Sequence, residues 1–240
     1  MSKAHRKSSV QKSAGRGRRA PAWLRDNGLS IALFALFALS IVGHAWSGWI
    51  ANNENLLTAG GQPLTLLQYL ASGAFISSVF ENWESEFLQM GTYVVLTAYL
   101  FQRGSPESKD PDEPAPQDRD PNLDRNNSRA PWPLRAGALA RTIYAHSLGL
   151  SLFALFAISF ILHWWGSTRH AADEALLAGE PIPTIWQHLA SAQFWFESFQ
   201  NWQSEFLSTG ALIVLAIYLR EWGSPESKPV AAPHGQTGND

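Results

Sequence analysis

Two sets of polar residues with matching spacing stand out in otherwise apolar stretches of the chain. Their members are His44, Asn82 and Glu86 in the first set, and His163, Asn201 and Glu205 in the second. In each set the asparagine and the glutamate are four residues apart, so on a helix they share one face. A histidine beside a carboxylate exchanges protons near neutral pH. These residue types therefore point to a proton or cation site, with His44 facing Asn82 or Glu86 and His163 facing Asn201 or Glu205.

The same residues also have a structural interpretation. Asn82 or Asn201 could act as an N-cap, with the following glutamate satisfying early backbone N–H groups. All six residues are expected near a membrane interface, where a charge costs little to hold. We therefore expect the two sets to be mainly structural, and we keep a transport role as the alternative.

The elements that position these residues are apolar segments without charge. No Asp, Glu, Lys or Arg occurs between Asp26 and Glu54 or between Arg141 and Arg169. Each run exceeds the roughly 20 residues that cross a hydrocarbon core. Two shorter uncharged runs, 87–102 and 206–219, reach across if their ends enter the headgroup region. These patterns predict four transmembrane helices.

The chain is an internal duplication. With a shift of 119 residues, Leu29–Lys109 aligns with Leu148–Lys228 without a gap, with about 37 identities in 81 positions. The motif NWxSEFL occurs at 82–88 and 201–207, and GSPESK at 104–109 and 223–228. Positions retained in both copies are therefore candidates for a shared structural or functional demand.

One retained pattern is a stripe with a spacing of four residues on each shorter apolar segment. Its members are Trp83, Phe87, Gly91, Val95 and Tyr99 in the first copy, and Trp202, Phe206, Gly210, Val214 and Tyr218 in the second. Such a stripe with a central glycine is typical of a helix-packing face. A ligand groove is the alternative.

The positions of the basic residues predict the orientation. Residues 1–25 carry eight Lys or Arg and no acid, and the linker 103–141 carries seven more basic residues. Because basic residues mark cytoplasmic segments, we expect both termini in the cytoplasm and most Trp residues at the outer face. The predicted parts are a disordered basic arm (1–27), a first hairpin (28–103), a disordered linker (104–138), a second hairpin (139–222) and a disordered tail (223–240).

Two further segments, 64–80 and 183–196, are apolar with scattered polar residues. They are extra spans, interfacial helices or outward extensions of the second span in each hairpin. Six spans would invert the second copy, whereas parallel copies fit four spans. We therefore predict an all-α polytopic membrane protein of two tandem hairpins with additional outer-face helices.

Composition and missing motifs limit the function. The net charge of −2 argues against nucleic-acid binding. No hydrolase, phosphate-loop or zinc-binding motif is present, so we predict no metal and no cofactor. A haem between His44 and His163 is disfavoured because Gly43 is replaced by Leu162 in the second copy. The expected partners are the bilayer, anionic lipids at the basic arm, and a second copy of the chain.

The NWxSEFL and GSPESK motifs and the doubled hairpin resemble a bacterial family of integral membrane proteins known only as a domain of unknown function. The resemblance covers Leu24–Pro229. It implies a bacterial multi-pass protein of the cytoplasmic membrane and brings no activity or catalytic residue. The leading interpretation is a non-enzymatic structural or interaction role. A small proton- or cation-coupled transporter is the first alternative, and a haem-binding or other membrane enzyme is the second.

Overall fold

The computed structural model describes residues 21–238, which contain helices and turns but no strand. The predicted all-α class is therefore confirmed for this part of the chain. Most of the predicted basic arm lies outside the described residues. The chain divides into two compact units at the Gly48–Trp49 bond. The first unit holds α1 (Ala22–Asp26) and the larger part of α2 (Gly28–Thr58).

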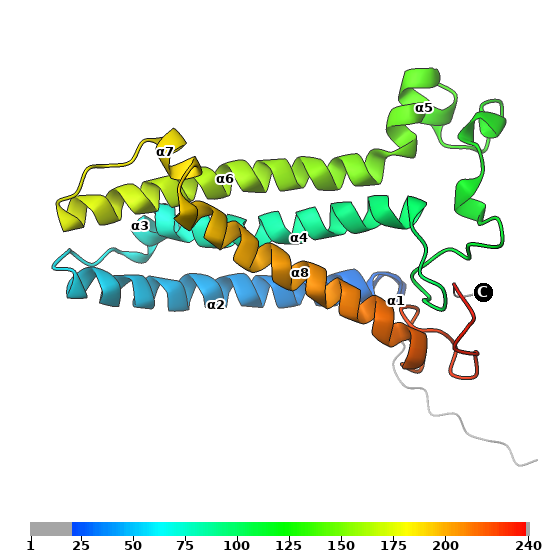
Figure 1. Ribbon diagram of the computed structural model, residues 1–240, viewed down its shortest axis with the longest axis horizontal. Coiled ribbons are helices and arrows are strands. Elements are labelled where there is room, and N and C mark those ends of the chain that lie inside the picture. The colour runs from blue at the N-terminus through cyan, green and yellow to red at the C-terminus, as the bar shows by residue number, and fades with distance from the viewer. Residues whose placement is uncertain (1–20, 239–240) are drawn as a thin grey trace, which may run out of the picture. The chain divides into compact units, whose positions relative to one another are not determined.

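The second unit, which carries the candidate site, contains three long helices (Figure 1). The elements after α2 are α3 (Leu66–Leu70), α4 (Gly73–Tyr99), three 3-10 helices η1 (Pro116–Asp118), η2 (Pro121–Asp124) and η3 (Trp132–Leu134), α5 (Ala138–Ala145), α6 (Ser147–Ala178), α7 (Ile185–Leu189) and α8 (Ala192–Tyr218). The linker 104–138, which we predicted to be disordered, thus carries η1, η2 and η3.

Two helices, α2 and α6, are long and apolar enough to cross a membrane by length and composition. The charge-free windows of the sequence predicted both. The helices α4 and α8, predicted as the other two spans, have 27 residues each but do not meet this condition of length and apolarity. At 1.5 Å per residue, such a helix is about 40 Å long.

The segments 64–80 and 183–196 each divide into two elements. A Thr–Gln capping box starts the short helix, with Thr65 and Gln68 at α3 and Thr184 and Gln187 at α7. A serine N-cap then starts the long helix, Ser72 at α4 and Ser191 at α8. The second part of each segment is therefore the beginning of the following long helix, an extension of it rather than a separate element.

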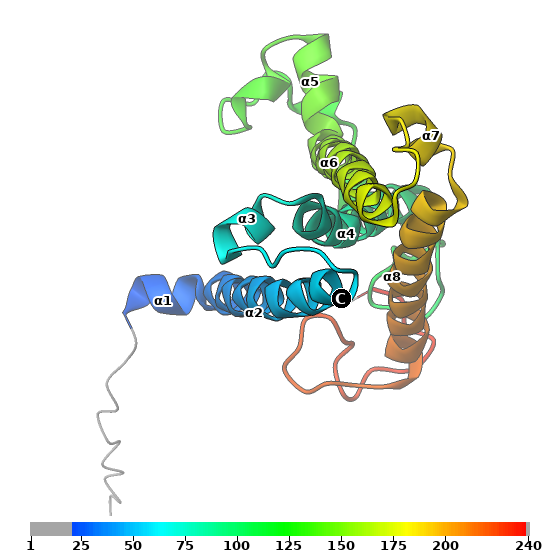
Figure 2. The same cartoon turned by 90° about the vertical axis from the view of Figure 1, so that its left-hand side faces the viewer.

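The closest helix pair joins α4 with α6, which run antiparallel. Their backbones touch near two glycines. A Cβ atom at Gly73 would lie 2.5 Å from the backbone nitrogen of His170, and a Cβ atom at Gly166 would lie 2.6 Å from the backbone nitrogen of Ser77. Figure 2 shows the two helices side by side, with α8 beside α4. Because α4 belongs to the first predicted hairpin and α6 to the second, the main packing joins the two hairpin segments.

Burial in this bundle is reversed relative to a water-soluble protein. The buried residues include Glu84, Ser85, His163, Ser167 and His188. On α8, by contrast, Phe199 is 57% exposed and Leu207 is 70% exposed. Apolar residues normally dominate a soluble core. A polar interior under an apolar surface fits helices that face lipid.

Candidate functional site

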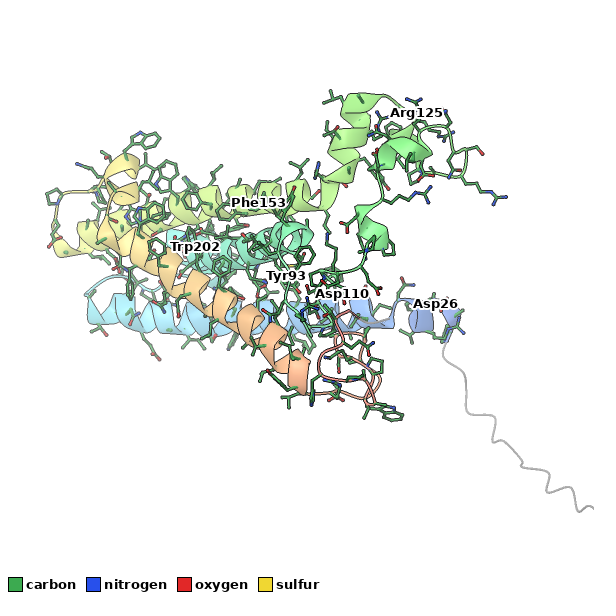
Figure 3. All side chains as sticks on the ribbon, turned by 45° about the vertical axis from the view of Figure 1, so that its right-hand side comes forward. Asp26, Tyr93, Asp110, Arg125, Phe153 and Trp202 are labelled. Carbon is green, nitrogen blue, oxygen red and sulfur yellow. The ribbon has the colours of Figure 1, made fainter. Side chains whose placement is uncertain are left out.

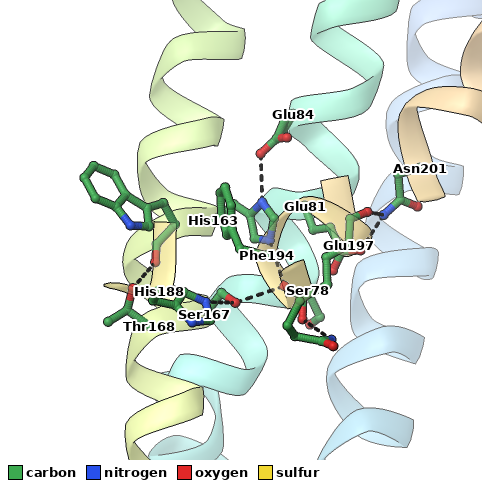
Figure 4. A network of polar contacts seen from close by, with 12 residues as sticks. Ser78, Glu81, Glu84, His163, Ser167, Thr168, His188, Phe194, Glu197 and Asn201 are labelled. Atoms are coloured by element: carbon green, nitrogen blue, oxygen red, sulfur yellow. Dashed lines mark hydrogen bonds and ion pairs between the residues drawn. The ribbon is translucent and has the colours of Figure 1, made fainter. Parts of the chain in front are cut away.

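A network of buried polar side chains joins α4, α6, α7 and α8, with His163 at its centre (Figure 4). The His163 Nδ1 atom lies 2.8 Å from Glu84 Oε2, and both side chains are completely excluded from solvent. The His163 Nε2 atom lies 3.4 Å from Glu197 Oε2. One imidazole therefore bridges carboxylates from two different helices.

Hydrogen bonds from α7 and α8 extend this network. The Ser167 hydroxyl donates to Glu197 Oε2 at 2.9 Å and lies 2.7 Å from His188 Nε2. Because a hydroxyl has one proton, His188 must donate from Nε2 when Ser167 donates to an ionised Glu197. Burial is the largest cause that lowers the pKa of His188. The lowered pKa favours the neutral imidazole, and in this arrangement its Nε2–H is directed at Ser167.

Two residues of α8 complete the carboxylate environment on α4. The Trp202 indole N–H donates to Glu84 Oε1 at 2.9 Å. The Asn201 amide donates to the Glu81 carboxylate and to the backbone oxygen of Glu197. Glu81 is also near enough to His163 to interact with it electrostatically. Both oxygens of Glu84 are thus occupied, and a third carboxylate lies beside the pair.

The aromatic packing fixes the central imidazole. Phe194 is completely buried, and its ring stacks on His163 with the centroids 4.9 Å apart. The same phenyl ring meets His188 edge-on at 5.8 Å. Because Phe194 comes one turn after the Ser191 cap, the start of α8 sets the position of both imidazoles.

The cluster contains more carboxyl groups than imidazoles. Three carboxyl groups, Glu81, Glu84 and Glu197, face two imidazoles, His163 and His188. Even with both imidazoles charged, full ionisation would leave a net negative charge in the bundle interior. An uncompensated buried charge is costly, which favours the binding of a proton or a cation at the cluster. In residues 21–238, no group of three or more metal-ligating side chains is arranged around a metal position.

Of the six residues predicted from the sequence, only some lie in the cluster. His163 and Asn201 lie in the cluster, but His163 bonds to Glu84 and Glu197 rather than to Glu205 or Asn201. His44 is half-buried in α2, in the first unit. Glu86 is exposed, and Glu205 is near enough to affect it electrostatically.

The expected capping role of Asn82 and Asn201 is wrong. Both residues lie inside their helices, which begin at Gly73 and Ala192. The Asn82 amide bonds to the Ser78 carbonyl of its own helix at 2.7 Å. The N-cap positions are instead held by Ser72 and Ser191, which accept from the Phe75 and Phe194 backbone N–H groups.

The two predicted packing stripes also differ. On α4, a Cβ at Gly91 would lie 3.4 Å from Leu152 Cβ, so this glycine packs against α6. On α8, nothing lies within 4 Å of the equivalent position at Gly210. Trp202 packs edge-on against Phe199 at 5.3 Å, whereas the later stripe members on both helices are exposed: Val95, Tyr99, Phe206, Val214 and Tyr218.

The fold and the cluster define a helical protein with two candidate membrane spans and a buried His–Glu network. The family model described as a domain of unknown function, DUF6766, matches residues 20–239, and the chain belongs to this family. No curated protein and no solved structure matches the chain.

Proposed function

We propose that this protein is a polytopic membrane protein whose buried His163 cluster takes up and releases protons. One observation carries the proposal: a continuous chain of hydrogen-bonding groups runs from His188 through Ser167, Glu197 and His163 to Glu84. Ionisable residues at membrane depth generally serve a transport or relay function. The surplus of carboxyl groups makes protons the natural occupant of the cluster.

The first step of the relay follows from the donor directions. A proton arrives at His188 Nδ1, and the proton on Nε2 passes to the Ser167 oxygen. The Ser167 proton moves at the same time to Glu197, which becomes a neutral carboxylic acid. His188 is left neutral with its proton on the other nitrogen, so one proton has moved inward and none has been lost. His163 then exchanges protons with Glu197 on one side and Glu84 on the other.

We further propose that α4 and α8 cross the membrane together with α2 and α6. The acids of the cluster point inward, while large apolar residues of α8 face outward. In the second unit, the ends of α4 and α8 and the start of α6 lie on one side, which carries Arg103, Arg141 and Arg220. The positive-inside rule places this side in the cytoplasm, and with it both termini.

Proton uptake by the purified protein tests the function. We expect wild type to take up protons when the detergent solution is brought from mildly alkaline to mildly acidic pH, and Glu84→Gln to take up at least one proton fewer per molecule. Glu180→Gln serves as the control, because that side chain is exposed. Equal uptake in wild type and Glu84→Gln would leave only a structural role for the cluster.

Reporter fusions test the four spans. We expect a reporter after residue 57 to be external and reporters after residues 120 and 235 to be cytoplasmic. An external reporter at residue 120 would contradict the arrangement.

A further inference from the structure

Two stripes of polar side chains continue from the cluster along the interface between α4 and α8. Each stripe has a spacing of four residues, which aligns side chains on one helix face. Their members are Glu81, Ser85, Gln89 and Tyr93 on α4, and Glu197, Asn201, Glu205 and Thr209 on α8. All eight are buried or half-buried. We call these eight residues the polar seam.

Two side-chain contacts, one near the cluster and one further along the helices, show that the two stripes face each other. Asn201 donates to Glu81 near the cluster, and the Gln89 amide donates to the Thr209 hydroxyl at 2.6 Å further along. Both contacts join positions 120 residues apart, so the stripes keep one register between them, although α8 runs obliquely to α4 (Figure 1). From Glu81 to Tyr93, the seam rises about 18 Å at 1.5 Å per residue.

The seam ends at a pocket beside the first GSPESK motif. The Tyr93 hydroxyl donates to Glu107 Oε2 at 3.0 Å. Tyr93 and Glu107 line an open cavity of about 260 Å³ with Gln102, Ser105 and Ile213. Figure 3 shows Tyr93 towards the end of α4 that leads to Asp110, away from Trp202 and the cluster.

Burying two aligned polar stripes costs free energy, and the packing of a helix pair does not require it. Apolar or small residues serve helix packing in a membrane, whereas buried hydroxyl, amide and carboxyl groups require partners. On α8 the polar residues of the seam face inward, while Phe199 and Leu207 remain exposed. The arrangement therefore keeps polar groups along one internal line.

We propose that the polar seam is the path along which protons pass between the His163 cluster and the pocket at Glu107. This inference rests on the proposed function, since the cluster supplies the proton. Successive seam members on one helix lie one turn apart, so the transfer of a proton between them requires bridging water, which hydroxyl, carboxyl and amide groups can hold. Each transfer breaks one O–H bond and forms another, so only one positive charge moves along the seam.

Conduction through the seam differs from proton uptake at the cluster, and the two are measured separately. In proteoliposomes with an internal pH dye, we expect Thr209→Val to lower the proton flux about tenfold or more. Valine keeps the shape of threonine but cannot accept the hydrogen bond from Gln89. Ser208→Ala is the matched control. The Ser208 hydroxyl, next to Thr209 in the chain, is exposed and donates only to the backbone oxygen of Glu205 on its own helix.

Tyr93→Phe tests the pocket end by removing only the hydroxyl that contacts Glu107. We expect the same loss of flux, with uptake by the detergent-solubilised variant equal to wild type. Full flux in both Thr209→Val and Tyr93→Phe would overturn the seam path and leave the uptake function standing. Wild-type uptake without flux would also overturn the path, whereas absent uptake would contradict the proposed function itself. A flux that follows a sodium or potassium gradient in place of the pH gradient would contradict proton conduction.

Discussion

His163 and Glu84 are hydrogen-bonded at 2.8 Å with both side chains fully excluded from solvent. They come from positions 79 residues apart in the chain and from two helices, α6 and α4. This buried contact joins α4 of the first sequence copy to α6 of the second. The electrostatics of the cluster and the stability of the α4–α6 pair therefore depend on each other.

Glu84→Gln removes the charge of this pair while keeping an oxygen for the Trp202 indole. Removing one partner of a buried ion pair typically costs about 3–5 kcal/mol, because the other charge stays uncompensated. We expect a markedly lower melting temperature in detergent. The exposed Glu180→Gln should change the stability by less than about 0.5 kcal/mol. Similar melting temperatures for both variants would mean that Glu84 and His163 are not charged together.

Gly166→Ala tests whether the close helix crossing positions the site. The added Cβ would lie 2.6 Å from the Ser77 backbone nitrogen, so α4 and α6 must separate. We expect a destabilisation of about 1–3 kcal/mol, typical of overpacking, together with loss of proton uptake. Gly210→Ala is the control, since its Cβ would meet nothing within 4 Å. A Gly166→Ala variant with wild-type melting would show that the crossing has room to spare.

Much of the fold could be predicted from the sequence, because the charge-free windows of α2 and α6 need only length and apolarity. Residues retained in both copies led to only part of the site, namely His163 and Asn201. In the second copy, the positions equivalent to Glu81 and Glu84 hold Gln200 and Gln203. In the first copy, the position equivalent to Glu197 holds Ser78. The acids occupy positions that differ between the copies, so retention pointed instead to Glu86 and Glu205.

The spacing of the seam is present in the sequence, but it does not single out the seam. Polar residues recur every fourth position from Glu81 to Tyr93 and from Glu197 to Thr209, but other polar residues, such as Glu84 and Gln203, lie between them. That period marks one face of a helix. Which two polar faces meet depends on the packing of α4 with α8, and the sequence pattern alone does not contain that information.

Ser198→Ala is expected to stabilise the protein. Its Oγ atom is buried and has no hydrogen-bond partner among the described residues. An unsatisfied buried polar group costs about 1–3 kcal/mol, and replacing it with a methyl group removes that cost. Thermal melting in detergent checks this. A clear destabilisation would indicate that the hydroxyl has a bound partner in the membrane.

The stability of the region around the first GSPESK motif should depend on pH through Glu107. Burial is the main cause that raises the pKa of Glu107, and a hydrogen bond with Glu226 adds to it. The folded protein therefore favours the protonated acid more than the unfolded chain does. Its contribution to stability is present below the ordinary glutamate pKa and is lost as the pH rises through the raised value.

Glu107→Gln should remove this dependence, because the amide stays neutral at every pH. We expect the variant to be more stable than wild type in mildly alkaline solution and similar to it in acid. Melting temperatures across the pH range measure the effect, with the exposed Glu113→Gln as the control. Parallel curves for wild type and Glu107→Gln would contradict the raised pKa.

The rate of proton uptake in Ser167→Ala tests the relay through the cluster most directly. This variant keeps every charge and removes only the hydroxyl between His188 and Glu197. Thr168→Val is its matched control, because the Thr168 hydroxyl bonds only to the Trp164 carbonyl of its own helix. After a rapid pH change, we predict that Ser167→Ala takes up the same number of protons as wild type about tenfold more slowly, while Thr168→Val matches wild type in both. An unchanged rate in Ser167→Ala would contradict the path from His188 to Glu84.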